Sequence, residues 1–161
     1  MSRQLRKAVA DIGGMDLNKE CSEGREGERD PLTQKVIGCA IEVHRTLGPG
    51  LLESTYQQCL AHELLLAGIQ FRIQVPISVD YKGVTLDCGY RADILIEDEL
   101  IVELKAVEQI LSVHEAQLIT YMRLPEMPTG LLLNFNVRYL KDGIRRLFPT
   151  PTFSPPSPSS L

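Results

Sequence analysis

One stretch, residues 91–105, constrains the fold more than any other part of the sequence. It reads R-A-D-I-L-I-E-D-E-L-I-V-E-L-K, with two apolar runs, 94–96 and 100–102, on either side of an acidic triplet. Short runs rich in Ile and Val that are bounded by polar residues are typical of buried β-strands. Because the connection between the two runs is short, the stretch predicts a β-hairpin.

The predicted hairpin brings charged residues of its two strands together. A turn centred on Asp98 gives the opposed pairs Ile94–Val102, Ile96–Leu100, Asp93–Glu103 and Arg91–Lys105. Since the side chains of a strand alternate between its faces, Glu103 and Lys105 share one face while Leu104 points to the other. The hairpin therefore predicts an acidic pair beside a lysine.

This acidic pair needs a physical explanation. Like charges directly opposite each other destabilise a sheet, and burying unpaired carboxylates costs more still. A divalent cation between Asp93 and Glu103 would remove both costs, and carboxylate, carbonyl and water oxygens suit Mg²⁺ or Mn²⁺. The alternative is that both carboxylates lie at solvated strand ends, with Lys105 as an ordinary ion-pair partner. The apolar surroundings of the two residues favour a metal site.

The composition indicates a soluble globular chain. Its 161 residues suit a single domain, with 43% hydrophobic and 24% charged residues. No apolar run approaches the roughly 18 residues of a membrane span, and the N-terminus lacks the apolar core of a secretory signal. Four widely spaced cysteines, without a C-x-x-C pair, favour reduced thiols, a cytoplasmic location and no zinc site.

The charge distribution bears on nucleic-acid binding. The formal net charge of −4 gives no overall basic surface, which counts weakly against a nucleic-acid partner. Residues 138–146 are locally basic, with four Arg or Lys residues against one Asp. That segment could contact a phosphate backbone, although a solvated charged face is the commoner explanation.

The two ends of the chain look unlike the middle. Residues 1–30 lack apolar periodicity, and residues 149–161 form a Pro/Ser-rich tail. We expect a disordered or weakly ordered extension at the first and a disordered tail at the second. The folded domain is predicted over residues 31–148.

Between these ends, the pattern predicts helices followed by strands. The expected elements are a helix capped by Thr33, a helix over 51–67 ended by Gly68, a strand over 71–79, a strand at 84–86, the hairpin, a helix over 112–123 capped by Ser112 or a neighbour, and a strand over 131–135. Pro76 places its strand at an edge or a bulge. Residues 137–148 fit either a hairpin or a short helix. This order predicts an α/β (α+β) fold, with a mixed sheet covered by helices on at least one face.

Several motifs in the same order resemble those of a known family. They are G-L-L-E-S-T-Y at 50–56, G-Y-R-A-D-I-L-I at 89–96, I-V-E-L-K at 101–105, Q-L-I-T-Y at 117–121, L-L-N-F-N at 132–136 and L-K-D-G-I-R-R-L at 140–147. Together they resemble the PD-(D/E)xK nuclease superfamily, and most closely its GxxExxY proteins, over about residues 33–148. The proline that precedes the aspartate in the family signature is replaced here by Ala92.

The resemblance implies a restriction-endonuclease-like core and metal-dependent hydrolysis of phosphodiester bonds in DNA, with Mg²⁺ or Mn²⁺ as cofactor. It assigns Asp93 and Glu103 as metal ligands, with the carbonyl of Leu104 as a further ligand. It adds Glu53 to the acidic cluster, as a direct or water-mediated metal ligand. Lys105 would orient or activate the attacking water and stabilise the charge that develops on the phosphate.

The resemblance also assigns substrate-binding roles. Gln117 and Tyr121, at positions i and i+4 of one helix, would support the lysine or contact a phosphate. For Glu53, Tyr56 and Tyr121, the plain alternatives are an exposed helix charge and two core aromatic residues. His44 and His62 are interpreted as structural or surface residues. His114, three residues before Gln117, could border the site.

Three functions remain open at this point. The first is a DNA nuclease. The second is a nucleic-acid-binding module that keeps the fold without turnover. The third is a protein-interaction domain, homo-oligomeric or with a protein partner, that uses the strand edge near Pro76. A membrane partner is not expected. A fold alone does not decide among these functions.

Overall fold

The computed structural model describes residues 30–149, so the predictions for residues 1–29 and 150–161 lie outside the described part. Its elements are α1 (Pro31–Leu47), α2 (Glu53–Leu66), β1 (Phe71–Tyr81), β2 (Val84–Ile96), β3 (Leu100–Lys105), α3 (Ser112–Arg123), β4 (Thr129–Asn134), the 3₁₀ helix η1 (Leu140–Gly143) and β5 (Ile144–Leu147). None of the described helices combines the length and the apolarity that crossing a membrane requires.

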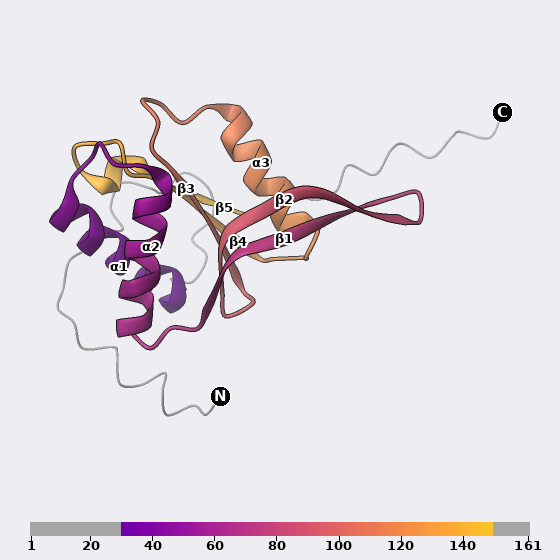
Figure 1. The fold of residues 1–161 in the computed structure, drawn as a ribbon, viewed down its shortest axis with the longest axis horizontal. Coiled ribbons are helices and arrows are strands. Elements are labelled where there is room, and N and C mark those ends of the chain that lie inside the picture. Colours follow the sequence, from indigo (N-terminus) through magenta and orange to yellow (C-terminus); the bar gives the residue numbers. More distant parts are fainter. Residues whose placement is uncertain (1–29, 150–161) are drawn as a thin grey trace.

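The strands form one five-stranded sheet in the order β1-β2-β3-β4-β5 (Figure 1). The β3–β4 pair is parallel and the other pairs are antiparallel. The sheet is therefore mixed, as the sequence predicts. Short turns join β1 to β2 and β2 to β3, a longer connection with η1 joins β4 to β5, and the parallel pair needs a crossover, which α3 supplies.

The helices cover the sheet on both faces (Figure 1). Helices α1 and α2 pack on one face, where Ile94, Val102 and Leu133 are buried with side chains of both helices. Helix α3 packs on the other face, against Leu95 and Leu132. Because neighbouring strand residues point to opposite faces, each central strand contributes to both cores. This explains why the central strands read as continuous apolar runs.

The start of α1 differs from that predicted. Asp30 caps α1: its Oδ1 accepts a 3.0 Å hydrogen bond from the Leu32 N–H, and its Oδ2 accepts a 2.6 Å bond from the Thr33 hydroxyl. The prediction of Thr33 as the cap is therefore wrong, because Pro31 opens the helix and Thr33 is already inside it. For α3, the predicted cap is Ser112 or a neighbour, and the N-cap residue is the neighbour Leu111. Ser112 is the first helical residue of α3, after Leu111.

Strands β1 and β2 form a hairpin much longer than predicted. The strand expected at 84–86 is only the start of β2, which continues to Ile96. Pro76 lies in the edge strand, one residue before a register shift between Ile77 and Ser78, so the edge and the bulge are both present. The distal half of the hairpin projects beyond the rest of the described chain (Figure 1).

The C-terminal segment contains the short helix of the two predicted alternatives, and the strand after it pairs with β4 rather than within the segment. Residues 137–148 contain η1 followed by β5, which pairs antiparallel with β4. Gly143, the last residue of η1, approaches the main chain of Asn134 so closely that a Cβ there would lie 2.1 Å from the Asn134 carbonyl oxygen. This contact attaches η1 to the end of β4.

Candidate functional site

The predicted hairpin register is confirmed where the two strands are paired. The β2–β3 ladder consists of Ile94–Val102, Leu95–Ile101 and Ile96–Leu100. Beyond Ile94, the main chains of β2 and β3 no longer pair, and β2 stays with β1, where Arg91 is opposite Pro76. The predicted Arg91–Lys105 pair is therefore absent from the ladder.

Where the β2–β3 ladder ends, the side chains of the acidic pair replace the main chain as hydrogen-bond acceptors between the two strands. The Asp93 N–H donates a 3.1 Å hydrogen bond to Glu103 Oε1, and the Leu104 N–H donates a 2.8 Å bond to Asp93 Oδ2. Each carboxylate thus satisfies an amide of the opposite strand, in place of a main-chain carbonyl. This exchange places Asp93 and Glu103 together where the pairing of the two strands ends.

The acidic pair carries more negative charge than its surroundings favour. Glu103 is 4% exposed, and burial, followed by the charge of Asp93, raises its pKa to about 8. Burial also raises the pKa of Asp93, and the charge of Glu53 adds to the effect, while the Leu104 N–H and Lys105 oppose it. Lys105 Nζ lies 3.9 Å from Glu103 Oε2. One lysine therefore does not neutralise the pair.

The donor set fits a hard divalent cation. The main-chain bonds occupy Asp93 Oδ2 and Glu103 Oε1. Of the second oxygens, Asp93 Oδ1 accepts a bond from Gln74, and Glu103 Oε2 lies nearest Lys105. Two carboxylate oxygens with water suit Mg²⁺ or Mn²⁺. Across residues 30–149, however, no group of three or more His, Cys, Asp and Glu side chains is arranged to hold a metal ion. The protein ligands brought together are therefore a pair, and the Leu104 carbonyl stays a prediction.

Glu53 reaches the same end of β3 from α2. It is the first residue of that helix, and its Oε1 accepts a 3.2 Å hydrogen bond from the Ala106 N–H, next to Lys105. The structure thus brings Glu53 beside the strand that carries the lysine, and its charge acts on Asp93. Glu53 is exposed, which is also what the alternative interpretation as an ordinary helix charge requires.

The rest of the G-L-L-E-S-T-Y motif holds the start of α2 in place. The Tyr56 hydroxyl donates a 2.6 Å hydrogen bond to the Gly48 carbonyl and accepts a 3.2 Å bond from the Leu51 N–H. Its ring stacks on Phe135, with centroids 4.3 Å apart. Gly50 has a φ of 104°, which favours glycine. Tyr56 is therefore a core residue whose position determines where Glu53 begins the helix.

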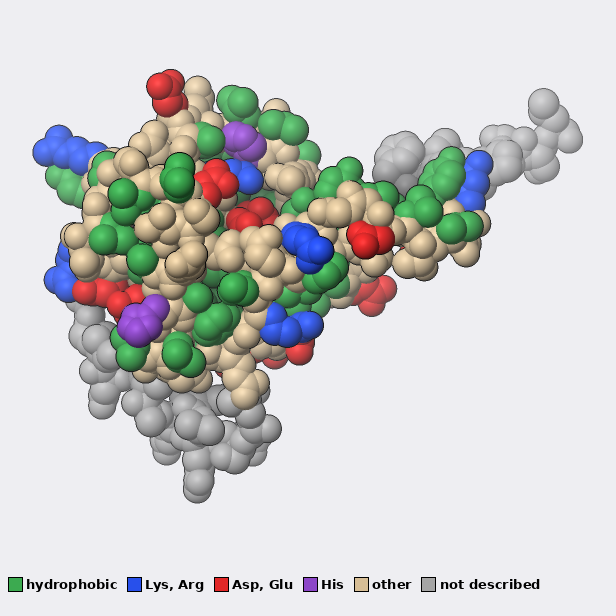
Figure 2. All heavy atoms as spheres, viewed as in Figure 1, with side chains coloured by type: hydrophobic (Ala, Val, Ile, Leu, Met, Phe, Trp, Pro, Cys, Tyr) green, Lys and Arg blue, Asp and Glu red, His purple; other side chains and the backbone are tan. Residues whose placement is uncertain are grey.

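Gln117 and Tyr121 contact each other on α3, as their spacing predicts. Gln117 Nε2 donates a 3.0 Å hydrogen bond to the Tyr121 hydroxyl. Burial raises the pKa of Tyr121, and the negative charges of Glu103 and Asp93 add to the effect. In Figure 2, acidic side chains lie beside a basic one between the helices and the base of the projecting hairpin.

Sequence reasoning missed two residues next to the site. Asn134 is buried: its Oδ1 accepts bonds from the N–H groups of Val107 and Asn136, and its Nδ2 donates a 2.8 Å bond to the Val107 carbonyl. A polar residue inside an apolar strand was the signal for it. Gln74, on β1, donates a 3.3 Å bond to Asp93 Oδ1, and nothing in the sequence singled it out.

The histidines take no part in the acidic pair. His44 is buried, with Nε2 2.9 Å from the Val137 carbonyl oxygen, and His62 is exposed, so both match their predicted structural and surface roles. His114 Nδ1 accepts a 3.0 Å bond from the Leu111 N–H at the start of α3. Its local role is to hold the first turn of that helix.

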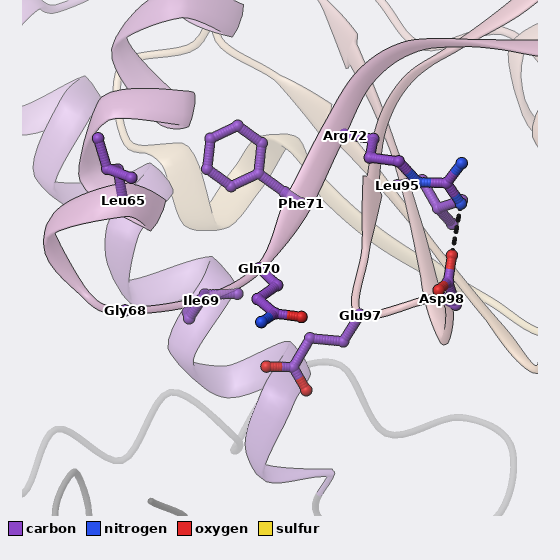
Figure 3. Close-up of a pocket in the computed structure, with 9 residues that line it drawn as sticks. All are labelled: Leu65, Gly68, Ile69, Gln70, Phe71, Arg72, Leu95, Glu97 and Asp98. Atoms are coloured by element: carbon purple, nitrogen blue, oxygen red, sulfur yellow. Dashed lines mark hydrogen bonds and ion pairs between the residues drawn. The ribbon is translucent and has the colours of Figure 1, made fainter. Parts of the chain in front are cut away.

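A hollow of about 640 Å³ lies at the opposite end of the β2–β3 hairpin from the acidic pair (Figure 3). Its lining includes Leu65 and Phe71 and the ion pair between Arg72 and Asp98, which are 2.5 Å apart. Figure 3 shows this ion pair at one side of the hollow, next to the β2–β3 turn. The acidic pair, which lies where the β2–β3 ladder ends, is therefore separate from this hollow.

One of the comparisons with known proteins gives a match. No significant match was found among curated proteins or among solved structures. The family model described as the PD-(D/E)XK nuclease superfamily matches residues 30–147, which include every helix and strand of the described chain. The chain belongs to the PD-(D/E)XK nuclease superfamily.

Proposed function

We propose that this protein is a metal-dependent nuclease that hydrolyses phosphodiester bonds in DNA, and that it belongs to the GxxExxY branch of its superfamily. One observation carries the proposal. The carboxylates of Asp93 and Glu103 meet where β2 and β3 separate, and Lys105 Nζ lies 3.9 Å from Glu103. The superfamily match supports it.

The residues of the site have distinct proposed roles. Asp93 and Glu103 would hold Mg²⁺ or Mn²⁺, assisted by the Leu104 carbonyl and by Glu53, directly or through water. The bound cation would supply an activated water and neutralise charge on the scissile phosphate. Lys105 would stabilise the charge that develops on that phosphate.

The substrate contacts would come from both sides of the acidic pair. Gln117 is exposed on α3 and bonded to Tyr121, so its amide could bind a phosphate beside Lys105. Arg138 and Lys141 are exposed in the segment that follows β4, and β4 is the strand paired with β3. The bound cation would offset part of the acidic net charge. These groups suit the polyanionic backbone of DNA.

The test combines metal binding with cleavage. We expect Mg²⁺ or Mn²⁺ to raise the thermal unfolding midpoint of the wild type and to support cleavage of labelled single- or double-stranded DNA. Glu103→Gln should abolish the metal-dependent rise, because it removes one of the two ligands. Lys105→Ala should lower the cleavage rate by about a hundredfold or more, while the protein stays folded.

Glu99→Gln is the matched control, because Glu99 is an exposed acid in the β2–β3 turn. It should behave as the wild type. Cleavage that persists unchanged in Lys105→Ala and in Asp93→Asn would remove the nuclease proposal.

A second candidate function is a binding module that keeps the nuclease fold without turnover. The projecting hairpin favours it, because Tyr81, Val84 and Leu86 are exposed there and suit contact with another macromolecule. Metal-independent DNA binding that weakens with salt, without cleavage, would support this candidate over the first. A defined oligomer or protein partner, with no DNA binding, would support a protein-interaction role.

A further inference from the structure

Gln74 has a main-chain conformation that is unusual for its position. Its φ is 52°, in the left-handed region that a side chain makes unfavourable. The structure describes four other non-glycine residues with positive φ, and each of them lies in a turn: Lys82, Glu97, Asp98 and Glu126. Gln74 alone among these described residues has it inside a strand, β1. Strain of this kind persists only where surrounding contacts enforce it, and such residues cluster at functional sites.

The conformation places Gln74 beside the acidic pair. Its neighbours Ile73 and Val75 pair with Ile94 and Ala92, so Gln74 lies across from Asp93 but is not itself paired with it. Its carbonyl instead accepts a 3.3 Å hydrogen bond from Arg91 Nη1. The regular ladder is therefore interrupted at the one residue of β1 that faces the proposed metal ligand.

The side chain of Gln74 connects two elements of the site. Nε2 donates a 2.7 Å hydrogen bond to Gln57 Oε1 and a 3.3 Å bond to Asp93 Oδ1. Gln57 lies one turn after Glu53 on α2. Because the Leu104 N–H holds the other oxygen of Asp93, both oxygens of this carboxylate are oriented by neighbouring groups. A ligand held at both oxygens loses little freedom when it binds a metal.

We infer that Gln74, aligned by Gln57, is a positioning residue that orients the Asp93 carboxylate for a divalent cation, and that its strained backbone is retained for this purpose. The inference rests on the proposed metal site. It adds Gln74, a residue of the edge strand β1, to that site. Through the hydrogen bonds of Gln74, α2 and β1 together orient the Asp93 carboxylate. Groups that hydrogen-bond metal ligands typically change metal affinity strongly when they are removed.

The experiment measures Mn²⁺ affinity and stability in the same variants. Gln74→Gly removes the side chain and relieves the backbone strain, whereas Gln74→Asn keeps an amide, tolerates positive φ, and is too short to reach Asp93. Free Mn²⁺, counted by electron paramagnetic resonance, gives the dissociation constant. Thermal unfolding without metal gives the stability. Lys82→Gly is the matched control, since it relieves a similar φ of 50° in the distant β1–β2 turn.

We expect both Gln74 variants to bind Mn²⁺ about ten- to a hundredfold more weakly than the wild type. Their unfolding midpoints should not fall, because relief of strain offsets the flexibility that glycine adds. Lys82→Gly should bind Mn²⁺ as the wild type does. A residue that only supports the fold would instead lower the midpoint and leave the affinity unchanged.

Two negative results have different meanings. If the wild type binds Mn²⁺ and both Gln74 variants bind it equally well, the inference about Gln74 is overturned while the proposed metal site stands. If the wild type does not bind Mn²⁺, or if Asp93→Asn leaves binding unchanged, the proposed site itself is wrong, and the role of Gln74 falls with it.

Discussion

At the scale of single residues, Glu103 shows the cost of assembling the site. Burial removes its carboxylate from water, and the neighbouring charge of Asp93 adds repulsion, so the pKa of Glu103 rises to about 8. The protein therefore holds a proton there at pH values where an exposed glutamate is ionised. A bound cation would favour the ionised form and release that proton.

This shift predicts a pH dependence of stability. Between about pH 5 and 8, the folded state retains a proton on Glu103 that the unfolded state has lost, so the free energy of unfolding falls as the pH rises. For one group, the fall is at most about 1.4 kcal/mol per pH unit. Urea unfolding in a chelator at several pH values within this window measures it.

One variant and one added cation test the cause of that dependence. Glu103→Gln cannot ionise, so its stability should change less between pH 5 and 8 than that of the wild type. In the wild type at pH 8, saturating Mg²⁺ should restore the free energy of unfolding that is lost as the pH rises. A wild type that becomes more stable as the pH rises through this window would contradict the assignment of a raised pKa to Glu103.

At the scale of elements, the loop after β3 depends on β4 and η1. Asn134, at the end of β4, bonds both the N–H and the carbonyl of Val107, two residues after Lys105. Gly143 of η1 packs directly against the Asn134 carbonyl. The C-terminal elements thus support the segment that follows the lysine, although they contribute no group to the acidic pair.

The close contact at Gly143 predicts that alanine substitutions at two glycines change the free energy of unfolding in opposite directions. Gly143→Ala should destabilise the protein by about 1–3 kcal/mol, because the new Cβ meets main chain that cannot rotate away. Gly38→Ala should stabilise it by up to about 1 kcal/mol, since Gly38 lies inside α1, where a Cβ has open space. Urea unfolding of both variants measures the difference; equal stabilities would contradict the observed approach of η1 to β4.

At the scale of the whole molecule, the β1–β2 hairpin divides into two parts. Its proximal part supplies Gln74 and Asp93 to the site, and its distal part projects from the body (Figures 1 and 2). From Ser78 to Asp87 no residue is fully buried. The distal part therefore adds little to either core.

Shortening the hairpin tests this division. Ser78 and Asp87 are register partners, so an Asn-Gly turn in place of residues 79–86 should close the hairpin. We expect a thermal unfolding midpoint within a few degrees of the wild type and an unchanged Mn²⁺ affinity. DNA or partner binding that is lost only in this variant would assign the distal part a binding role. Unfolding of the variant would show instead that the projecting part is needed for the fold.

Local sequence patterns predicted much of this structure because they reflect short-range physics. The apolar runs around residues 97–99, the alternation through β1 and the periodicity of the helices depend on residues that are neighbours in the chain. They indicated the β2–β3 register and the mixed sheet with its helices, and the proline rule placed Pro76 at an edge or a bulge. The cap prediction failed at Thr33 because capping depends on which residue first takes helical dihedral angles.

What the sequence by itself determined is the hairpin that carries Asp93, Glu103 and Lys105, since strand alternation and a short turn leave few other arrangements. Only the tertiary structure decided that β2 and β3 separate at the acidic pair, that Glu53 reaches the Ala106 N–H, and that Gln74 adopts positive φ to contact Asp93. These contacts join residues 10 to 53 positions apart in the chain, or lie across a strand pair. They form because packing of α2, β1 and α3 brings the groups together, and no local preference of the chain encodes that packing.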